Sequence, residues 1–501
     1  MKIVCRYVAL VALVVFLSAL RWPQLMALEI FAHGDPGSVL TGAKLTAVGM
    51  APGVDFVYPY GLGAIAVADV VLSIFGFSPT TYTLTCIVLA AVYAAAIGWA
   101  LTPIGINGAI MVVVAAGVAL GIPLPSPNFV HLLEPILLSI AVGLHARKLP
   151  EAALCLVTAT AFFVKPGLGY FYGLMLVLES IIATIRDDMP RWRTLFRRLL
   201  PATITGLTLG LILVARYGIR AVATTMLPTT GMSVYAHDSS GFFENGRQFW
   251  MPMGRSWKYY LGTPVGFWLV ATGLLMCFAC FLLVKRINRV PESSVAERLV
   301  VICGFLHGVF VLMIFGPPTS WFYDFNLLVI GVAATVTIAS RFRFGNWFMW
   351  GLLVSAIFGN YTGARHAAEI WKTWIEVPGT DRLYAAPGFA EEWLRLGKLA
   401  ERDRVYVLNF YGASSLLNSH LLSPESWSFW WWCAPEAEVR RGLDGIRRSR
   451  IVAVPRYLGF DEASTHPAKG PPFDAELRRF PIVEIWKGYR ILRATKSDPW
   501  P

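Results

Sequence analysis

Two carboxylates, Asp35 and Asp55, lie near the ends of residues 33–63, the most polar and the most Gly- and Pro-rich stretch of the N-terminal half. A carboxylate can deprotonate or orient an attacking hydroxyl when it is held near a reaction centre. Each acid also has a structural alternative. Asp35 would cap a helix that starts near Gly37, and Asp55 would accept backbone hydrogen bonds in a turn. We expect chemistry in this stretch, and both alternatives stay open.

Three further polar side chains stand beside apolar runs, where they would meet a charged substrate. Lys165 precedes Pro166 at the end of one run, and its ammonium would bind a phosphate as a point charge or would only reach lipid headgroups. His131 and Glu134 are three residues apart and share one helix face. They would form a second acidic site, a metal pair or a helix cap.

Aromatic and basic side chains complete the candidate binding residues. Tyr58 and Tyr60 follow Asp55 and would line a substrate site or would lie at a membrane interface. Arg255 belongs to a second polar loop, whose cations would bind a phosphate or would anchor to headgroups. An aromatic run at residues 427–433 would stack on the rings of a substrate, dip into a bilayer surface or pack in a core.

The composition shows what kind of chain must position these residues. Of its 501 residues, 56% are hydrophobic and only 15% are charged, whereas soluble domains have about 25% charged residues. The mean hydropathy is +0.57, and the apolar runs have the length of helices. The net charge of +12 comes from basic residues at the ends of these runs, as in cytoplasmic loops. The pattern predicts a polytopic membrane protein, and it does not indicate nucleic-acid binding.

Basic residues between the apolar runs predict which connections face the cytoplasm. Lys2 and Arg6 place the N-terminus inside, ahead of an uncleaved first span, because no signal-peptidase site follows it. Arg147 and Lys148 must also lie inside, yet the number of apolar runs between Arg6 and Arg147 is odd. One of these runs, residues 62–77, is short and contains an acid. We therefore expect it to lie along the outer interface instead of crossing.

This topology predicts two domains. Residues 1–361 form an all-α membrane domain of about eleven spans plus the juxtamembrane helix, with outer loops at residues 21–82 and 216–262. Residues 362–501 are more polar and form a small α/β domain on the outer side.

Three segments carry the α/β prediction for the C-terminal domain. Residues 403–412 and 449–459 have the apolar pattern of buried parallel strands and are flanked by helical patterns. Residues 481–493 alternate like an edge hairpin. No Gly-rich phosphate fingerprint follows either strand.

The order of these parts resembles a known family. A first span is followed by an outer loop of the form D-x-G…A-x-x-L-x-x-G…D-F-x-Y-P-Y-G, then by an outer Lys-Pro turn (FFVKPGLG), then by an outer C-terminal domain. This order resembles the GT-C-type membrane glycosyltransferases, in particular the mannosyltransferase-like and aminoarabinose-transferase-like group that uses polyprenyl-phosphate sugars. The loop residues that carry the resemblance are Asp35, Gly37, Ala43, Leu45 or Thr46, Gly49, Asp55, Phe56, Tyr58, Pro59, Tyr60 and Gly61.

The resemblance implies an activity and a location. A sugar would pass from a polyprenyl-phosphate lipid to a glycolipid, polysaccharide or protein, with Asp35 as the base or acceptor-positioning group. A divalent cation is a candidate cofactor, and no nucleotide is expected at the site. The chain would lie in a bacterial inner membrane, among membrane lipids, with its N-terminus cytoplasmic and its C-terminal domain periplasmic.

This chain departs from the family pattern at two places. Pro36 follows the first acid where many members have Glu, and Glu134 is the only acid of the next outer connection, which has no Arg. Two other classes remain as alternatives, a transporter or flippase and a non-catalytic envelope-assembly protein. Transporters place ionisable residues near mid-span, whereas the apolar runs here are nearly free of charges.

Overall fold

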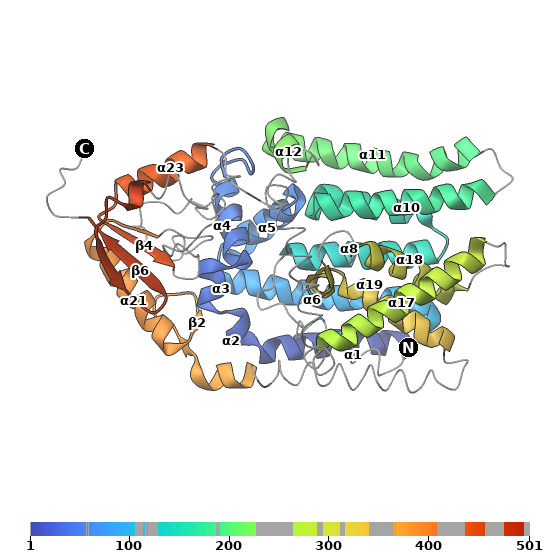
Figure 1. Cartoon of the computed structure of the whole chain (residues 1–501), viewed down its shortest axis with the longest axis horizontal. Helices are drawn as coiled ribbons and strands as arrows, with labels where there is room; N and C mark the ends of the chain where they lie inside the picture. Colours follow the sequence, from blue (N-terminus) through green and yellow to red (C-terminus); the bar gives the residue numbers. More distant parts are fainter. Residues whose placement is uncertain are drawn as a thin grey trace.

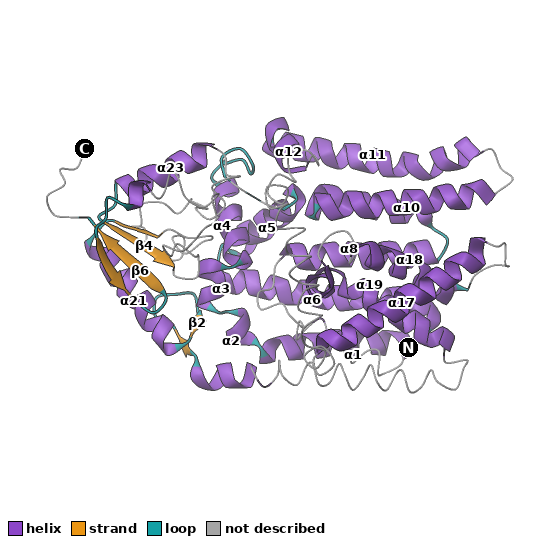
Figure 2. Cartoon of the chain, in the orientation of Figure 1, coloured by secondary structure: helices purple, strands orange, loops and turns teal. Residues whose placement is uncertain are grey.

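The computed structural model describes residues 2–105 except 57 and 59, residues 114, 115 and 118, and residues 129–186, 191–226, 264–287, 294–310, 316–339, 365, 367–407, 436–455 and 475–494. Long helices run side by side along the long axis of the molecule, and a small sheet lies at one end (Figure 1, Figure 2). The bundle contains α1 (Lys2–Leu20), α6 (Pro79–Leu101), α8 (Phe129–Ala146), α9 (Pro150–Ala159), α10 (Pro166–Arg186), α11 (Arg191–Tyr217), α17 (Pro264–Ile287), α18 (Val295–Phe310) and α19 (Gly316–Ala339).

Helix α6 shows how the sequence builds one of these helices. Ser78 is its N-cap, and the Ser78 hydroxyl accepts a hydrogen bond of 3.1 Å from the backbone N–H of Thr81, so one N–H of the open first turn is satisfied. Pro79 opens the helix, where its missing N–H costs nothing. Further along, Ala94 and Ala100 are fully buried, and such small side chains let neighbouring helices approach closely.

The apolar helices only partly test the predicted number of spans. Among the described residues, two helices are long and apolar enough to cross a membrane, Pro79–Ile104 and Arg193–Tyr217, and further apolar helices are shorter, with 10–17 residues. The mostly helical architecture agrees with the sequence, whereas the polytopic arrangement and the count of about eleven spans stay predictions. Of the predicted runs, residues 346–359 lie outside the described residues, as do nearly all of residues 106–121.

The two ends of the bundle differ in what they carry. The N-terminus, the turn between α8 and α9, the last residues of α10 and the first of α11 lie at the end away from the sheet (Figure 1). In that turn, Arg147 donates to the carbonyls of Gly143 and Trp99, both at 2.7 Å. This is the relative arrangement that the basic residues predict, and the orientation in a membrane stays a prediction.

Short helices fill the space between the bundle and the sheet (Figure 1). They are α2 (Trp22–Leu25), α3 (Leu28–His33), α4 (Asp35–Ala47) and α5 (Leu62–Phe75). Helix α5 corresponds to the run predicted to lie along the interface. Ala68 and Leu72 on its inner face are fully buried, whereas Val70, Ile74 and Phe75 are 59%, 69% and 71% exposed. An apolar exposed edge on a short helix suits a membrane interface, and that location stays a prediction.

The C-terminal region is an α/β unit. Its four-stranded sheet has the order β3-β4-β6-β5, with β3 parallel to β4 and with β5 and β6 as an antiparallel hairpin. The parallel pair, the hairpin and the two flanking helices are those that the sequence pattern predicts. The elements are β1 (Ile375–Glu376), β2 (Tyr384–Ala385), α21 (Pro387–Arg402), β3 (Val405–Val407), α23 (Glu436–Arg447), β4 (Ile451–Pro455), β5 (Ile482–Ile485) and β6 (Tyr489–Arg493).

The α/β unit is bonded to the first loop and to the helix ends on either side of it. The indole N–H of Trp371 donates to the carbonyl of Leu20 at 2.6 Å. The backbone N–H of Tyr384 donates to the carbonyl of Met26 at 2.8 Å. The carboxylate of Asp381 accepts the N–H of Thr80 at 2.9 Å. From α23, Arg441 donates to the backbone carbonyl of Asp55. These contacts place the predicted outer loop and the C-terminal unit at the same end of the bundle.

Candidate functional site

Two glycines hold the segment after Asp55 against the end of helix α9. The N–H of Gly61 donates to the carbonyl of Val164 at 3.0 Å. A Cβ atom at Gly63 would lie 2.2 Å from the Cα of Phe163, so only glycine allows this approach. The first loop therefore packs directly on the residues that precede Lys165.

A π-helical turn, Thr160–Val164, ends α9 and sets the position of Lys165. The N–H of Lys165 donates to the carbonyl of Thr160 at 2.9 Å, and Lys165 itself is extended, with φ −151° and ψ 88°. Pro166 then begins α10 with the φ that a helix needs. Single π turns are frequent at functional sites. Here the turn leaves Lys165 only 9% exposed at the sheet-facing end of the bundle.

Lys165 and Glu134 form an ion pair. Glu134 lies on α8, is fully buried, and has its Oε2 3.8 Å from the Nζ of Lys165. That separation is an ion pair but is too long for a direct hydrogen bond. Two buried charges lose much hydration, so such a pair adds little to stability. Stability alone therefore does not explain why these two charges are buried.

Three aromatic rings extend this pair toward the first loop. The rings of Tyr58 and Tyr60 meet edge to face with centroids 5.7 Å apart, and the rings of Tyr60 and His131 do so at 6.0 Å. His131 and Glu134 lie on successive turns of α8, as their spacing predicts. Five predicted binding residues thus form one buried cluster, which we call the Lys165 cluster: Tyr58, Tyr60, His131, Glu134 and Lys165.

Asp55 has a local structural role. Its carboxylate accepts the backbone N–H of Ala51 at 2.7 Å, and its own N–H donates to the carbonyl of Ala51 at 2.8 Å. These bonds are those of the turn that was the structural alternative for this residue. The donation from Arg441 to the Asp55 carbonyl fixes the turn from the other side. A further role of Asp55 in the reaction stays a prediction.

Asp35 is the first residue of α4. The helix begins two residues before the expected Gly37, and its N-cap is Gly34, with φ −118° and ψ 175°. Gly34 therefore occupies the cap position that was predicted for Asp35, and Asp35 is the first residue of the helix. A Cβ at Gly37 would lie 1.9 Å from the carbonyl oxygen of Phe31, so this glycine lets α4 pack on α3. The Asp35 side chain and Arg255 lie outside what the structure describes.

Helix α4 packs, around Gly42, on the segment that follows Asp55. A Cβ at Gly42 would meet Ile65, Phe56 and Tyr58 at 3.0, 3.5 and 3.6 Å. Further along α4, burial lowers the pKa of Lys44, a residue that the motif did not single out.

An ion pair that the sequence did not reveal holds α5 in place. The carboxylate of Asp69, which is 6% exposed, accepts a hydrogen bond of 2.5 Å from the guanidinium of Arg216, whose side chain is 55% exposed. The pair joins α5 to the end of α11. The sequence shows an acid inside an apolar run, which indicates that a partner is needed. It does not show which cation provides it.

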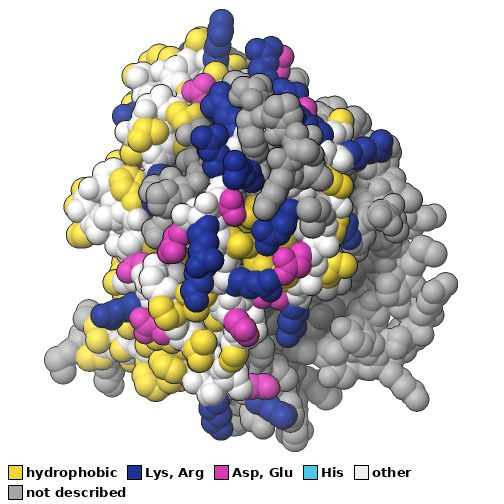
Figure 3. Space-filling view, turned by 90° about the vertical axis from the view of Figure 1, so that its left-hand side faces the viewer, with side chains coloured by type: hydrophobic (Ala, Val, Ile, Leu, Met, Phe, Trp, Pro, Cys, Tyr) yellow, Lys and Arg dark blue, Asp and Glu magenta, His cyan; other side chains and the backbone are white. Residues whose placement is uncertain are grey.

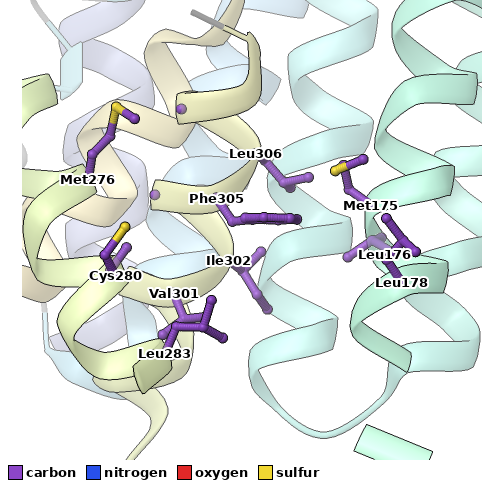
Figure 4. Close-up of a pocket in the computed structure, with 13 residues that line it drawn as sticks. Met175, Leu176, Leu178, Met276, Cys280, Leu283, Val301, Ile302, Phe305 and Leu306 are labelled. Atoms are coloured by element: carbon purple, nitrogen blue, oxygen red, sulfur yellow. The ribbon is translucent and has the colours of Figure 1, made fainter. Parts of the chain in front are cut away.

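An apolar cavity of about 240 Å³ opens between α10, α17 and α18 (Figure 4). Met175 on α10, Met276 and Cys280 on α17, and Phe305 on α18 lie around it. Flexible thioethers such as these adapt to irregular apolar ligands. Because α10 starts directly after Lys165 and rises 1.5 Å per residue, Met175 lies about 15 Å along the helix from Lys165.

The described residues do not provide a metal site. Among them, no group of three or more His, Cys, Asp and Glu side chains could hold an ion. His131 and Glu134 would be the nearest pair of ligands, but the ammonium of Lys165 already places a positive charge 3.8 Å from Glu134, where it would repel a cation. His131 and Glu134 therefore do not fit a metal ion, and a divalent cation elsewhere at the site stays a prediction.

Comparison with known proteins gives a fold and no family. No family model matches the chain, and neither does any curated protein sequence. Among solved structures, the chain is similar to the crystal structure of the Archaeoglobus fulgidus oligosaccharyltransferase in complex with Zn and sulfate. The TM-score is 0.51 at 10% sequence identity, covering 89% of this chain and 68% of that one. This likeness shows that the two chains share a fold.

Proposed function

We propose that this chain is an integral membrane glycosyltransferase that moves a sugar from a polyprenyl-phosphate donor to an extracytoplasmic acceptor. The Lys165 cluster is the observation that carries the proposal. It places a buried cation and a buried carboxylate among aromatic rings, directly against the loop with Asp35 and Asp55. The fold shared with an oligosaccharyltransferase supports the same class of reaction. The acceptor would be a glycolipid, a polysaccharide or a protein, and the membrane a bacterial inner membrane.

In this proposal Lys165 binds the phosphate of the donor. A charged donor group is worth more in a buried site than in water, because few solvent dipoles compete with it. Glu134 at 3.8 Å keeps the ammonium in place. When the bond between the sugar C1 and the phosphate oxygen breaks, the oxygen keeps the electron pair, and Lys165 stabilises the charge that develops on the polyprenyl phosphate.

Asp35 acts on the acceptor. It takes the proton from the acceptor hydroxyl while that oxygen forms its bond to C1, so the products are the glycoside, polyprenyl phosphate and a protonated Asp35. The turn around Asp55 keeps the loop in place, and Tyr58 and Tyr60 present aromatic surface to the sugar. The apolar cavity along α10 accommodates part of the hydrocarbon tail.

The test uses the full chain in proteoliposomes with a labelled polyprenyl-phosphate sugar. Asp35→Asn should lower transfer by at least about 100-fold, the usual contribution of a general base, while donor binding remains. Glu29→Gln, which removes an exposed acid from the same loop, is the matched control and should transfer normally. Unchanged transfer by Asp35→Asn would remove that residue from the mechanism. A wild-type chain that does not bind the donor but shows substrate-driven flux would be a transporter.

A further inference from the structure

A cluster of arginines covers the end of the molecule farthest from the bundle. It forms where β3 and β4 begin, next to the end of α23 (Figure 1). Figure 3 views this end and shows many Lys and Arg side chains across it, with Asp and Glu side chains between them. We call these residues the arginine tip: Arg404, Arg447, Arg448, Arg450, Arg478 and Arg479.

The backbone of the tip is fixed by the sheet. The carbonyl of Arg404 accepts the N–H groups of Arg450 and Ile451 at 2.9 and 3.2 Å, and the carbonyl of Arg450 accepts the N–H of Ala494 at 3.0 Å. Arg404 and Arg450 therefore start adjacent parallel strands, about 4.8 Å apart. The two arginines are therefore close enough for neighbouring anionic groups of one extended polymer to meet both of them.

The tip carries more positive charge than its own acids neutralise. Arg447 and Arg479 share the carboxylate of Glu476 at 2.7 and 3.0 Å, and Arg447 also pairs with Asp444 at 3.6 Å. These two acids face six arginines. Arg404, Arg448 and Arg450 are exposed and have no acidic partner within the part of the chain that the structure describes. Elsewhere on this unit the pattern differs, because Arg395 pairs with Glu484.

The exposed arginines and their position at the end of the molecule indicate what kind of partner would bind there. A lipid surface does not fit, because the tip points away from the helical bundle (Figure 1). Guanidinium groups form two parallel hydrogen bonds with carboxylate or phosphate, which lysines do not. We infer that the arginine tip is a docking surface for an anionic polysaccharide, whose carboxylate or phosphate groups bind Arg404, Arg448 and Arg450. The choice of a glycan over other polyanions rests on the proposed function.

The test measures binding to the full chain in nanodiscs of phosphatidylcholine. The probes are polygalacturonate, which carries carboxylates, phosphomannan, which carries phosphates, neutral dextran, and inorganic polyphosphate. Wild type should bind at least one anionic glycan, with an affinity that falls as salt rises. The two glycans tell which anion the tip prefers. Equal or tighter binding of dextran or polyphosphate would overturn the inference.

Variants locate the binding. Arg404→Ser/Arg448→Ser/Arg450→Ser should bind the glycan about tenfold more weakly, as expected for the loss of three exposed charge contacts. A control that removes the same charge outside the tip, Arg365→Ser/Lys372→Ser/Lys398→Ser, should stay within about twofold. Equal weakening by both triple variants would overturn the inference. Binding does not need transfer, so Lys165→Met should bind the glycan normally, and normal transfer by Lys165→Met would contradict only the proposed function.

Discussion

Two ion pairs at the sheet-facing end of the bundle differ in almost every respect. Asp69 and Arg216 make a short hydrogen bond, and more than half of the Arg216 side chain is exposed. Glu134 and Lys165 are both buried and stay 3.8 Å apart. The Asp69–Arg216 pair, which we call the clamp, holds α5 against the end of α11 by a charge-assisted hydrogen bond. The second pair keeps both charges buried at a longer separation, and in the proposed function its ammonium meets the phosphate of the donor.

The largest expected effect is on sugar transfer, which should depend on Lys165 much more than on Arg216. Lys165→Met should lower sugar transfer by at least about 100-fold, because the developing phosphate charge loses its buried cation. Arg216→Met should change transfer much less, within about threefold, since Arg216 only supports α5. Initial rates with a labelled donor in proteoliposomes give both values. Equal losses would show that the pairs have the same role.

The second effect is on stability. Glu134→Gln should lower the free energy of unfolding by about 3 kcal/mol, because it leaves a buried Lys165 without its carboxylate. Glu134→Gln/Lys165→Met removes both charges and should regain most of that loss. Equilibrium unfolding in mixed micelles measures the difference. If the double variant is as unstable as the sum of the single ones, the buried charges do not depend on each other.

A smaller loss is expected at the clamp. Asp69→Asn should lower the free energy of unfolding by about 1 kcal/mol, because a charge-assisted bond is weakened but one partner is largely exposed. The coupling between Asp69→Asn and Arg216→Gln in a double-mutant cycle should be of similar size. A coupling near zero would mean that the short hydrogen bond between Asp69 and Arg216 does not stabilise the fold.

The smallest effect concerns a third, exposed pair in the sheet. The hydrogen bond from Trp486, together with the guanidiniums of Arg493 and Arg395, holds the pKa of Glu484 below its usual range. The folded pKa is the lower one, so this stabilisation is present above the unfolded pKa of about 4.3 and is lost as the pH falls through the folded value. Glu484→Gln should therefore make stability less dependent on pH below about 4.3. Thermal unfolding at several pH values measures it, and an unchanged profile would contradict it.

The comparison also shows what the sequence could and could not predict. Local patterns were sufficient for the strands that contain Val405 and Ile451, because apolar runs of that length bounded by helices specify a buried sheet. The partners of Lys165 and Asp69 were not predictable, since each lies on another helix and depends on how the bundle packs. The start of α4 differed by two residues because helix boundaries are weakly specified by local signals.

The bond between Trp371 and Leu20 joins residues 351 positions apart. A ribosome adds about 5–20 residues per second, so about 20–70 s of synthesis separate the first helix from its partner in the C-terminal unit. During that interval the loop with Asp35 and Asp55 has left the ribosome, but the C-terminal α/β unit that packs on it has not yet been made. A nascent chain that stops early would therefore present an unsupported loop. The contact from Arg441 to the turn at Asp55 forms later still.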